Sequence, residues 1–222
     1  MDTPMSKRRP KKAGRSKNPV EARQRILAAA REQFSKHTFA GARIDTIARE
    51  AGFNQRMLYH YFGDKAGLYV AVLEAILGEL RQAEMKFSVG TESPIDSILR
   101  MFDFTYEHFG SHPEAVSLMS GENLMRGEFI RGSVNIPNVS SPVLNQIGEL
   151  LKRGEADGTI RKDIPPLHLY ILMVGIAYFH RSNGYTLSAI FRQDVLAEDW
   201  QNEHHRLGRE FLRSYIRSEG AR

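Results

Sequence analysis

The sequence has no cysteine among its 222 residues. Disulfide bonds, zinc sites built from thiolates and cysteine nucleophiles are therefore excluded. A chain without disulfides suits a reducing compartment, and we expect the protein to be cytoplasmic.

Long apolar runs are also missing. The longest covers residues 169–179, which is well short of the ~20 residues that a membrane-spanning helix needs, and it predicts a buried helix. The basic N-terminus is not followed by an apolar segment of ~7–15 residues, so no secretory signal is expected. The sequence therefore predicts no membrane-spanning segment and no secretion, and the favoured interpretation has no membrane partner.

The sequence lacks the patterns that are typical of catalysis. A glycine-rich phosphate loop, a nucleophile elbow and paired carboxylates in a cleft are all missing, so we predict no catalytic residues and no enzyme. Two histidine pairs, 108/112 and 204/205, have to be considered as metal ligands. Gly110 and Pro113 interrupt the helix around the first pair, and adjacent histidines point ~100° apart on a helix. We therefore expect no metal site and no cofactor.

The chain does have the composition of a globular protein with an uneven charge. Hydrophobic residues make up 41% and charged residues 26%, enough to bury a core. Residues 1–65 hold 15 Lys and Arg against 6 Asp and Glu, whereas residues 66–222 hold 16 against 20. Seven of the basic side chains lie within the first 17 residues. Either this basic end faces a polyanion, nucleic acid first and anionic membrane second, or it is a solubilising disordered extension.

Apolar residues recur at steps of three and four along most of the chain, which indicates amphipathic helices. No alternating strand pattern persists and no internal repeat is found. The sequence predicts an all-α fold of about nine helices, at residues 19–36, 44–51, 54–62, 68–87, 95–109, 116–125, 143–152, 167–179 and 200–215. Residues 127–142 are expected to be loose because of their Gly and Pro, and residues 183–193 are left undecided.

The most specific pattern lies at residues 44–62. Ile47, Ala48, Ala51, Gly52 and Leu58 have the spacing of a helix-turn-helix, in which a small residue allows close helix crossing and a glycine with positive φ allows the sharp turn. Spacing alone fits an ordinary helical corner equally well.

A longer stretch of sequence distinguishes a helix-turn-helix from an ordinary helical corner. Ile44-Asp-Thr-Ile-Ala-Arg-Glu-Ala-Gly-Phe53, followed by Asn54-Gln-Arg-Met-Leu-Tyr-His-Tyr-Phe-Gly-Asp-Lys65, resembles the DNA-binding head of the TetR-type repressors. The resemblance covers about residues 20–75. It implies an all-α homodimer with a three-helix DNA-binding head, a fourth connecting helix and a variable C-terminal ligand domain. On this basis we expect a disordered basic arm at residues 1–18, a DNA-binding domain at 19–65 and an effector-binding and dimerisation domain at 66–222.

The resemblance also implies roles for residues of the head. Asn54 caps the recognition helix, and Gln55, Arg56 and Met57 at its start face base edges. Tyr59 and His60 face phosphate or a thymine methyl group, and Lys65 holds a phosphate. The chain departs from the family at Ala42-Arg43, where a Thr or Ser is usual, so Arg43 is expected to contact the DNA backbone instead. The basic arm either enters the minor groove, with Arg8, Arg9, Lys11 and Lys12, or is a spectator.

The C-terminal part shows no motif of comparable strength, although residues 141–193 are similar to regulators of small aromatic or heterocyclic compound catabolism. Candidate pocket residues are polar or polarisable groups where apolar helices converge: Phe104, His108, Met119, Asn123, Arg126, Met173 and Tyr178. One Arg between aromatic walls suits a small planar acid. Each of these residues is also compatible with an ordinary core or surface role.

A stripe on the last predicted helix is wide enough to bury against a second chain. It consists of Trp200, His204, Leu207, Phe211 and Tyr215. Together with residues 167–179, the resemblance implies a four-helix dimer interface. Packing within one chain remains the alternative for Trp200.

These observations lead to one function and two alternatives. We predict a homodimeric repressor that binds a double-stranded DNA operator and is released by a small-molecule effector. The first alternative is a DNA-organising dimer that takes no ligand, and the second is a membrane-surface protein that uses the basic tail.

Overall fold

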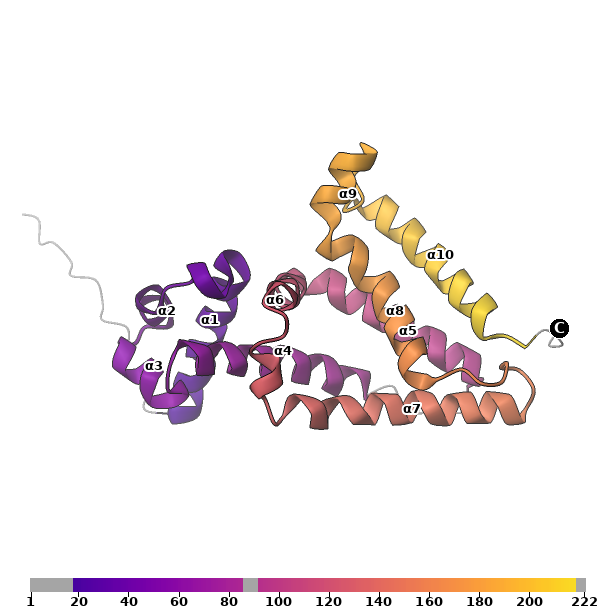
Figure 1. The fold of residues 1–222 in the computed structure, drawn as a ribbon, viewed down its shortest axis with the longest axis horizontal. Coiled ribbons are helices and arrows are strands. Elements are labelled where there is room, and N and C mark those ends of the chain that lie inside the picture. The colour runs from indigo at the N-terminus through magenta and orange to yellow at the C-terminus, as the bar shows by residue number, and fades with distance from the viewer. Residues whose placement is uncertain (1–17, 86–91, 219–222) are drawn as a thin grey trace, which may run out of the picture.

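The computed structural model describes residues 18–85 and 92–218. These residues form ten α-helices and one 3-10 helix, and the predicted all-α fold is confirmed (Figure 1). The helix beyond the predicted nine is α9, in the stretch that the sequence left undecided.

The helices follow one another along the chain. Their bounds are α1 Pro19–Gly41, α2 Ile44–Ala51, α3 Gln55–Phe62, α4 Lys65–Glu84, α5 Pro94–Ser111, α6 Pro113–Leu124, η1 Ile130–Gly132, α7 Ile136–Ala156, α8 Pro166–Ser182, α9 Gly184–Phe191 and α10 Glu198–Ile216. In Figure 1 α1–α3 form one end of the molecule, α4 runs from them along the body, and α9 projects away from α5 and α7.

Side-chain caps explain where several of these helices begin. The side-chain oxygens of Asn18, Asn54 and Asp64 accept hydrogen bonds from backbone N–H groups in the first turns of α1, α3 and α4, at 3.0, 3.0 and 2.7 Å. Each bond satisfies a donor that has no partner inside its helix.

Two helix boundaries differ most from the predictions. Helix α1 was predicted to end near Lys36, but it resumes after Thr38, whose φ of 61° and ψ of 177° mark a kink, and ends at Gly41. Helix α7 begins at Ile136, within the segment predicted to be loose. The Ser133 hydroxyl accepts a hydrogen bond from the Ile136 N–H at 3.2 Å, so a local cap starts a helix that continues through Pro142.

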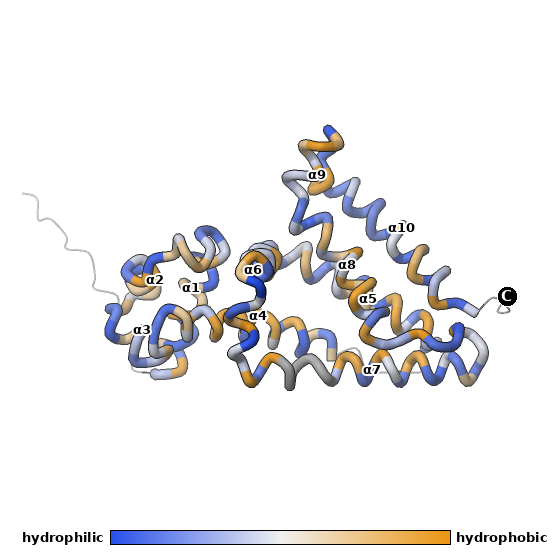
Figure 2. The backbone as a smooth tube through the Cα atoms, in the orientation of Figure 1, coloured by the Kyte–Doolittle hydropathy of each residue, from blue (hydrophilic) through white to orange (hydrophobic). Residues whose placement is uncertain are grey.

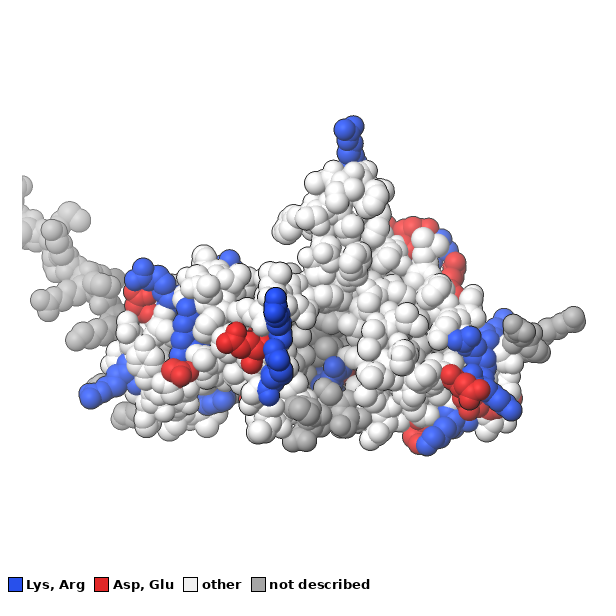
Figure 3. Space-filling model, viewed as in Figure 1, with Lys and Arg blue, Asp and Glu red and all other residues white. Residues whose placement is uncertain are grey.

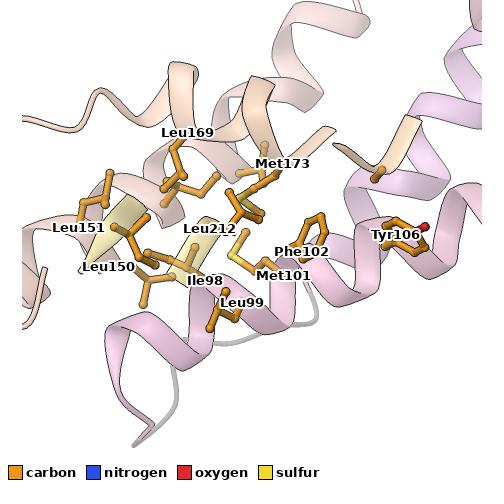
Figure 4. Close-up of a cluster of buried hydrophobic side chains, with 14 of the residues drawn as sticks. Ile98, Leu99, Met101, Phe102, Tyr106, Leu150, Leu151, Leu169, Met173 and Leu212 are labelled. Carbon is orange, nitrogen blue, oxygen red and sulfur yellow. The ribbon is translucent and has the colours of Figure 1, made fainter. Parts of the chain in front are cut away.

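The buried apolar residues form two clusters. The head cluster joins α1, α2, α3 and the first part of α4 to Ala115 and Leu118 of α6. The body cluster joins α5, α7, α8 and α10, and includes Leu80 near the end of α4 (Figure 4). Helix α4 therefore belongs to both clusters, and so does α6, because Val116 is part of the body cluster.

The prediction that residues 167–179 form a buried helix is wrong for one face of α8. Leu169, Met173 and Ala177 are buried against the body. By contrast, Leu167, Ile171 and Phe179 are 49, 57 and 58% exposed. Figure 2 shows hydrophobic residues along α8. Neighbouring helices cover only one side of α8, so an apolar stripe is left on the other.

Candidate DNA-binding surface and ligand cavity

The turn between α2 and α3 has the geometry of a helix-turn-helix. Gly52 ends α2 with a φ of 78°, in the left-handed region that glycine adopts without strain. Ala48 and Leu58 are 3 and 1% exposed, so the two helices cross closely and α3 is anchored by its inner face. The outer face of α3 is thereby directed away from the core.

The predicted base-reading residues lie on that outer face. Gln55, Arg56 and His60 are exposed, Tyr59 is 46% exposed, and Met57 is half-buried. Asn54 is exposed as well, but its side-chain oxygen is occupied by the cap to the Met57 N–H at 3.0 Å. The N-terminal turn of α3 therefore presents two long polar side chains, Gln55 and Arg56, side by side.

Arg43 and Lys65, the two candidate phosphate contacts, lie in different surroundings. Arg43 is exposed and forms an ion pair with Asp45 at 3.2 Å, and its hydrogen bonds lower the pKa of that carboxyl. The Lys65 ammonium group lies 4.9 Å from the centroid of the Phe39 ring and donates to the Ala40 carbonyl at 3.4 Å. Burial lowers the pKa of Lys65. The positions of Arg8, Arg9, Lys11 and Lys12 in the predicted arm lie outside the described residues.

The body holds a cavity of about 500 Å³ between α4, α5, α6 and α8. Four of the seven candidate ligand residues line it: His108, Met119, Asn123 and Tyr178. The remaining lining residues are mostly apolar: Ile76, Leu77, Leu80, Arg81, Phe109, Ala115, Tyr170, Ile171 and Val174. Its size and largely apolar wall with few polar groups are typical of sites for small organic molecules.

The other three candidates lie elsewhere. The Phe104 ring stands 5.7 Å from that of His108 and packs against the body cluster. Met173 is 1% exposed and belongs to that cluster. Arg126 is exposed, and its carbonyl accepts a hydrogen bond from Arg131 at 2.6 Å. The arginine that lines the cavity is therefore Arg81 and not Arg126.

One end of the cavity carries neutral hydrogen-bonding groups. Burial, together with the stacked His112 ring at 4.2 Å, lowers the pKa of His108 to about 4. The Tyr178 hydroxyl lies 2.8 Å from the Ser120 hydroxyl and donates to the Val116 carbonyl at 3.3 Å. Burial raises the pKa of Tyr178, so both groups are uncharged near neutral pH.

The other end carries a charged pair that the sequence reasoning missed. Nη1 of Arg81 donates to the carboxylate of Glu84 and to the Tyr170 hydroxyl, which lies 3.3 Å from Glu84 Oε1. The Glu84 side chain is 2% exposed, and burial raises its pKa. A signal was present, because Glu84 continues the buried stripe of Leu73, Ile76 and Leu80 at helical spacing.

Polar contacts tie the helices around the cavity to the head. Arg31 of α1 forms ion pairs with Glu79 of α4 and Glu114 of α6, both at 2.7 Å. The Ser117 hydroxyl on α6 donates to the Ser35 carbonyl on α1 at 2.6 Å. The first head helix is therefore attached to two helices that also bound the cavity.

A second apolar surface is formed by α8 and α10. Leu207 and Phe211 are 49 and 55% exposed, whereas Trp200 and His204 are half-buried and stack on each other at 4.8 Å. Tyr215 is half-buried beneath Arg161, whose guanidinium carbon lies 4.0 Å from the ring centroid. In Figure 3 the surface over α8 carries few charged side chains.

The described residues, 18–85 and 92–218, hold neither a cluster of metal-ligating side chains nor a membrane-spanning helix. Within these ranges no three His, Cys, Asp or Glu side chains gather in a way that could hold a metal ion. None of the helices described there is long and apolar enough to cross a membrane.

Comparison with known proteins points in the same direction as the geometry. Residues 26–72 match the family described as bacterial regulatory proteins, tetR family, and residues 94–211 match the tetracyclin repressor-like C-terminal domain. The chain is 34% identical to the HTH-type transcriptional repressor NicS of Pseudomonas putida over 181 residues. The aligned region covers 82% of this chain and 85% of the relative. The chain is also 29% identical over 164 residues to the HTH-type transcriptional repressor SCO4008 of Streptomyces coelicolor, covering 73 and 79%. Among solved structures, the putative transcriptional regulator SCO4942 of Streptomyces coelicolor superposes with a TM-score of 0.64 at 22% identity, over 88% of this chain and 98% of that chain.

Proposed function

This chain belongs to the tetR family of bacterial regulatory proteins, and from that premise we propose that it is a homodimeric repressor released from its operator by a small organic effector. The observation that carries the proposal is the cavity of about 500 Å³ between helices that also support the head. A DNA-organising protein that takes no ligand has no need of such a cavity, so the cavity favours the ligand-responsive function. The proposal includes no catalytic step.

The exposed face of α3 supports a division of roles at the operator. Arg56 and Gln55 suit bidentate contacts with guanine and adenine in the major groove. Tyr59 and His60, which are exposed on α3, suit contacts with phosphate or a thymine methyl group, and Arg43 suits the DNA backbone. To reach a phosphate, Lys65 must give up its hydrogen bond to the Ala40 carbonyl. The phosphate is a charged acceptor and therefore forms a stronger hydrogen bond with the ammonium group than the carbonyl does.

The stripe on α8 and α10 supports dimerisation. Two copies that pair through Ile171, Phe179, Leu207 and Phe211 bury side chains that are 49–58% exposed in one chain. Such a pair carries two heads, which must enter major grooves about one helical turn, ~34–36 Å, apart or a workable multiple of it. Ligand control then acts through the separation and tilt of the heads.

The test starts from the full-length protein and a pool of random DNA duplexes. Repeated selection should enrich two related half-sites in inverted orientation, because a two-fold dimer reads a palindrome. A thermal-shift screen of metabolites should then identify compounds that raise the melting temperature, since a ligand of the native state stabilises it by mass action. Compounds found in this way should release the selected operator. Enrichment of a site that no stabilising compound releases would instead favour the DNA-organising alternative.

A further inference from the structure

The Arg81 guanidinium has two distinct edges, and the described residues use only one of them. Its hydrogen bonds to Glu84 and Tyr170 both leave from Nη1. Nε is buried and has no hydrogen-bond partner among the described residues, although Arg81 lines the cavity. A buried donor without a partner is unfavourable, so this edge is prepared for an acceptor that the cavity receives from outside.

We propose that the effector is an elongated organic acid whose carboxylate binds the Nε edge of Arg81, with its apolar body extending toward Tyr178. This inference rests on the proposed function and names the chemical class of its effector. A carboxylate suits the site because its two oxygens match the parallel N–H groups along one edge of a guanidinium.

Glu84 and Tyr170 hold Arg81 in place for this contact. The Arg81 guanidinium carbon lies 4.9 Å from the centroid of the Tyr170 ring, and Nη1 is bound by Glu84 and the Tyr170 hydroxyl. Arginine has five donors, so one guanidinium can bind two carboxylates on different edges. Glu84 nevertheless adds a negative charge beside the incoming acid, and its removal should therefore strengthen acid binding.

The separation of the polar ends sets the length of the effector. Tyr170 and Tyr178 are eight residues apart on α8, which corresponds to about 12 Å of helix rise. Leu80, Met119 and Val174 line the cavity between the two ends. A short acid such as phenylacetate would leave much of this apolar wall uncovered, whereas an acid with a longer body covers it and brings its far end to His108 and Asn123.

The experiment measures binding to the full-length protein by calorimetry, without DNA. The probes are phenylacetate, phenylbutanoate and phenylhexanoate, each paired with its primary amide, which keeps the shape and removes the charge. We expect the acids to bind about tenfold or more tightly than their amides, because a hydrogen bond to a charged group is worth more than a neutral one. The longer acids should bind more tightly than phenylacetate.

Two variants assign the contact to Arg81. Glu84→Gln should strengthen acid binding and leave amide binding nearly unchanged. Arg81→Met in the Glu84→Gln background removes both charges together, so no buried charge is left unpaired, and it should abolish the preference for acid over amide. The melting temperature and operator binding of the double variant report whether it folds. Because the preference is a ratio within one variant, a change in stability alone leaves it unaffected.

Three outcomes would overturn the inference: equal binding of acids and amides, binding of neither series, or an acid preference that persists in the double variant. None of them bears on the proposed function, because operator selection and the metabolite screen do not depend on these probes. Failure of the screen with successful binding of the acids would in turn count against ligand-controlled repression and leave the acid site standing.

Discussion

Arg56 and Lys65 are both cations of the head, but their surroundings differ in a way that assigns them different roles. Arg56 is exposed on the outer face of α3 with its fork of donors free to reach base edges. Lys65 is half-buried against Phe39 and carries a single point charge. An arginine can discriminate between bases, whereas an ammonium group near a phosphate cannot.

The first prediction compares these two residues. Arg56→Ala should lower affinity for the selected operator by ~1–3 kcal/mol and relax the preference at one base pair. Lys65→Ala should weaken binding to all sequences alike and flatten the dependence of affinity on salt. Fluorescence anisotropy with a set of single-base operator variants at several salt concentrations measures both effects. Lys152→Ala, which removes an exposed cation of the body, is the control and should change neither. Identical profiles for Arg56→Ala and Lys65→Ala would contradict the assignment.

A second prediction at this scale concerns two buried histidines. Burial lowers the pKa of His108 to about 4 and that of His180 to about 3, below the unperturbed value of about 6.5. In acid the unfolded chain binds protons that the folded chain does not, so stability is fully present above about pH 6.5 and is lost as the pH falls toward 4. Each histidine should contribute a slope of up to about 1.4 kcal/mol per pH unit in that window.

Urea denaturation at several pH values between 7 and 5 measures this slope. His108→Asn should reduce it, because the titrating ring is gone while a polar group remains at the cavity. His37→Gln, at an exposed position of α1, is the matched control and should leave the slope as it is. A slope that is the same in all three proteins would show that His108 takes up its proton in the folded state as readily as in the unfolded one.

Individual residues differ in how far the sequence predicted their roles. The cap at Asn54 and the positive φ of Gly52 follow from local chemistry, and they were predicted. The gathering of His108, Met119, Asn123 and Tyr178 at one cavity was also anticipated, although their function there stays a prediction. Arg81 was missed because its partner Tyr170 lies 89 positions along the chain, and only the packing of α4 against α8 brings the two together.

At the scale of helices, most of the ends that are set by local residues were predicted well, and the ends that are set by packing were not. Helices α2, α3 and α4 have a cap or a glycine at their ends, and their predicted and observed bounds agree to within a few residues. The start of α7 depends on a cap from Ser133, three residues earlier, which the Gly and Pro of that segment obscured. Helix α9 depends on contacts with another segment. Gly184 at the start of α9 packs so tightly that an added Cβ would lie 2.5 Å from Leu196, an approach that periodicity does not reveal.

The prediction for the α8 and α10 surface concerns assembly. Phe211→Glu places a charge on the exposed apolar stripe, so it should convert the dimer into a monomer, and light scattering after gel filtration measures this. Operator affinity should fall with it, because one head alone contacts half of the palindrome. Asn202→Glu adds the same charge on the opposite side of α10 and should leave the dimer intact. A dimeric Phe211→Glu protein that still binds its operator would place the interface elsewhere.

On the scale of the whole molecule, the two apolar clusters meet along α4 and beneath α6. A change in the cavity therefore has a short route to the recognition helix. It passes through α4, which begins beside α3, and through Arg31, which joins α1 to α4 and α6. The Arg31 side chain is 23% exposed and the two carboxylates are 51 and 29% exposed, so these ion pairs contribute more to alignment than to stability.

The final prediction follows from this arrangement and from thermodynamic linkage. If an effector weakens operator binding, the operator must weaken effector binding by the same factor, for a coupling free energy typically of ~1–3 kcal/mol. Titration of an effector identified in the thermal-shift screen, with and without saturating operator, measures that factor. Arg31→Met should reduce the coupling while changing each separate affinity less, because it loosens α1 from α4 and α6 without touching the cavity or α3. Glu79→Gln removes only one of the two ion pairs and should have an intermediate effect. Equal effector affinity in the two titrations of the unmodified protein would refute induction. Full coupling in Arg31→Met would move the route of communication to α4 or to the Ser117–Ser35 contact between α6 and α1.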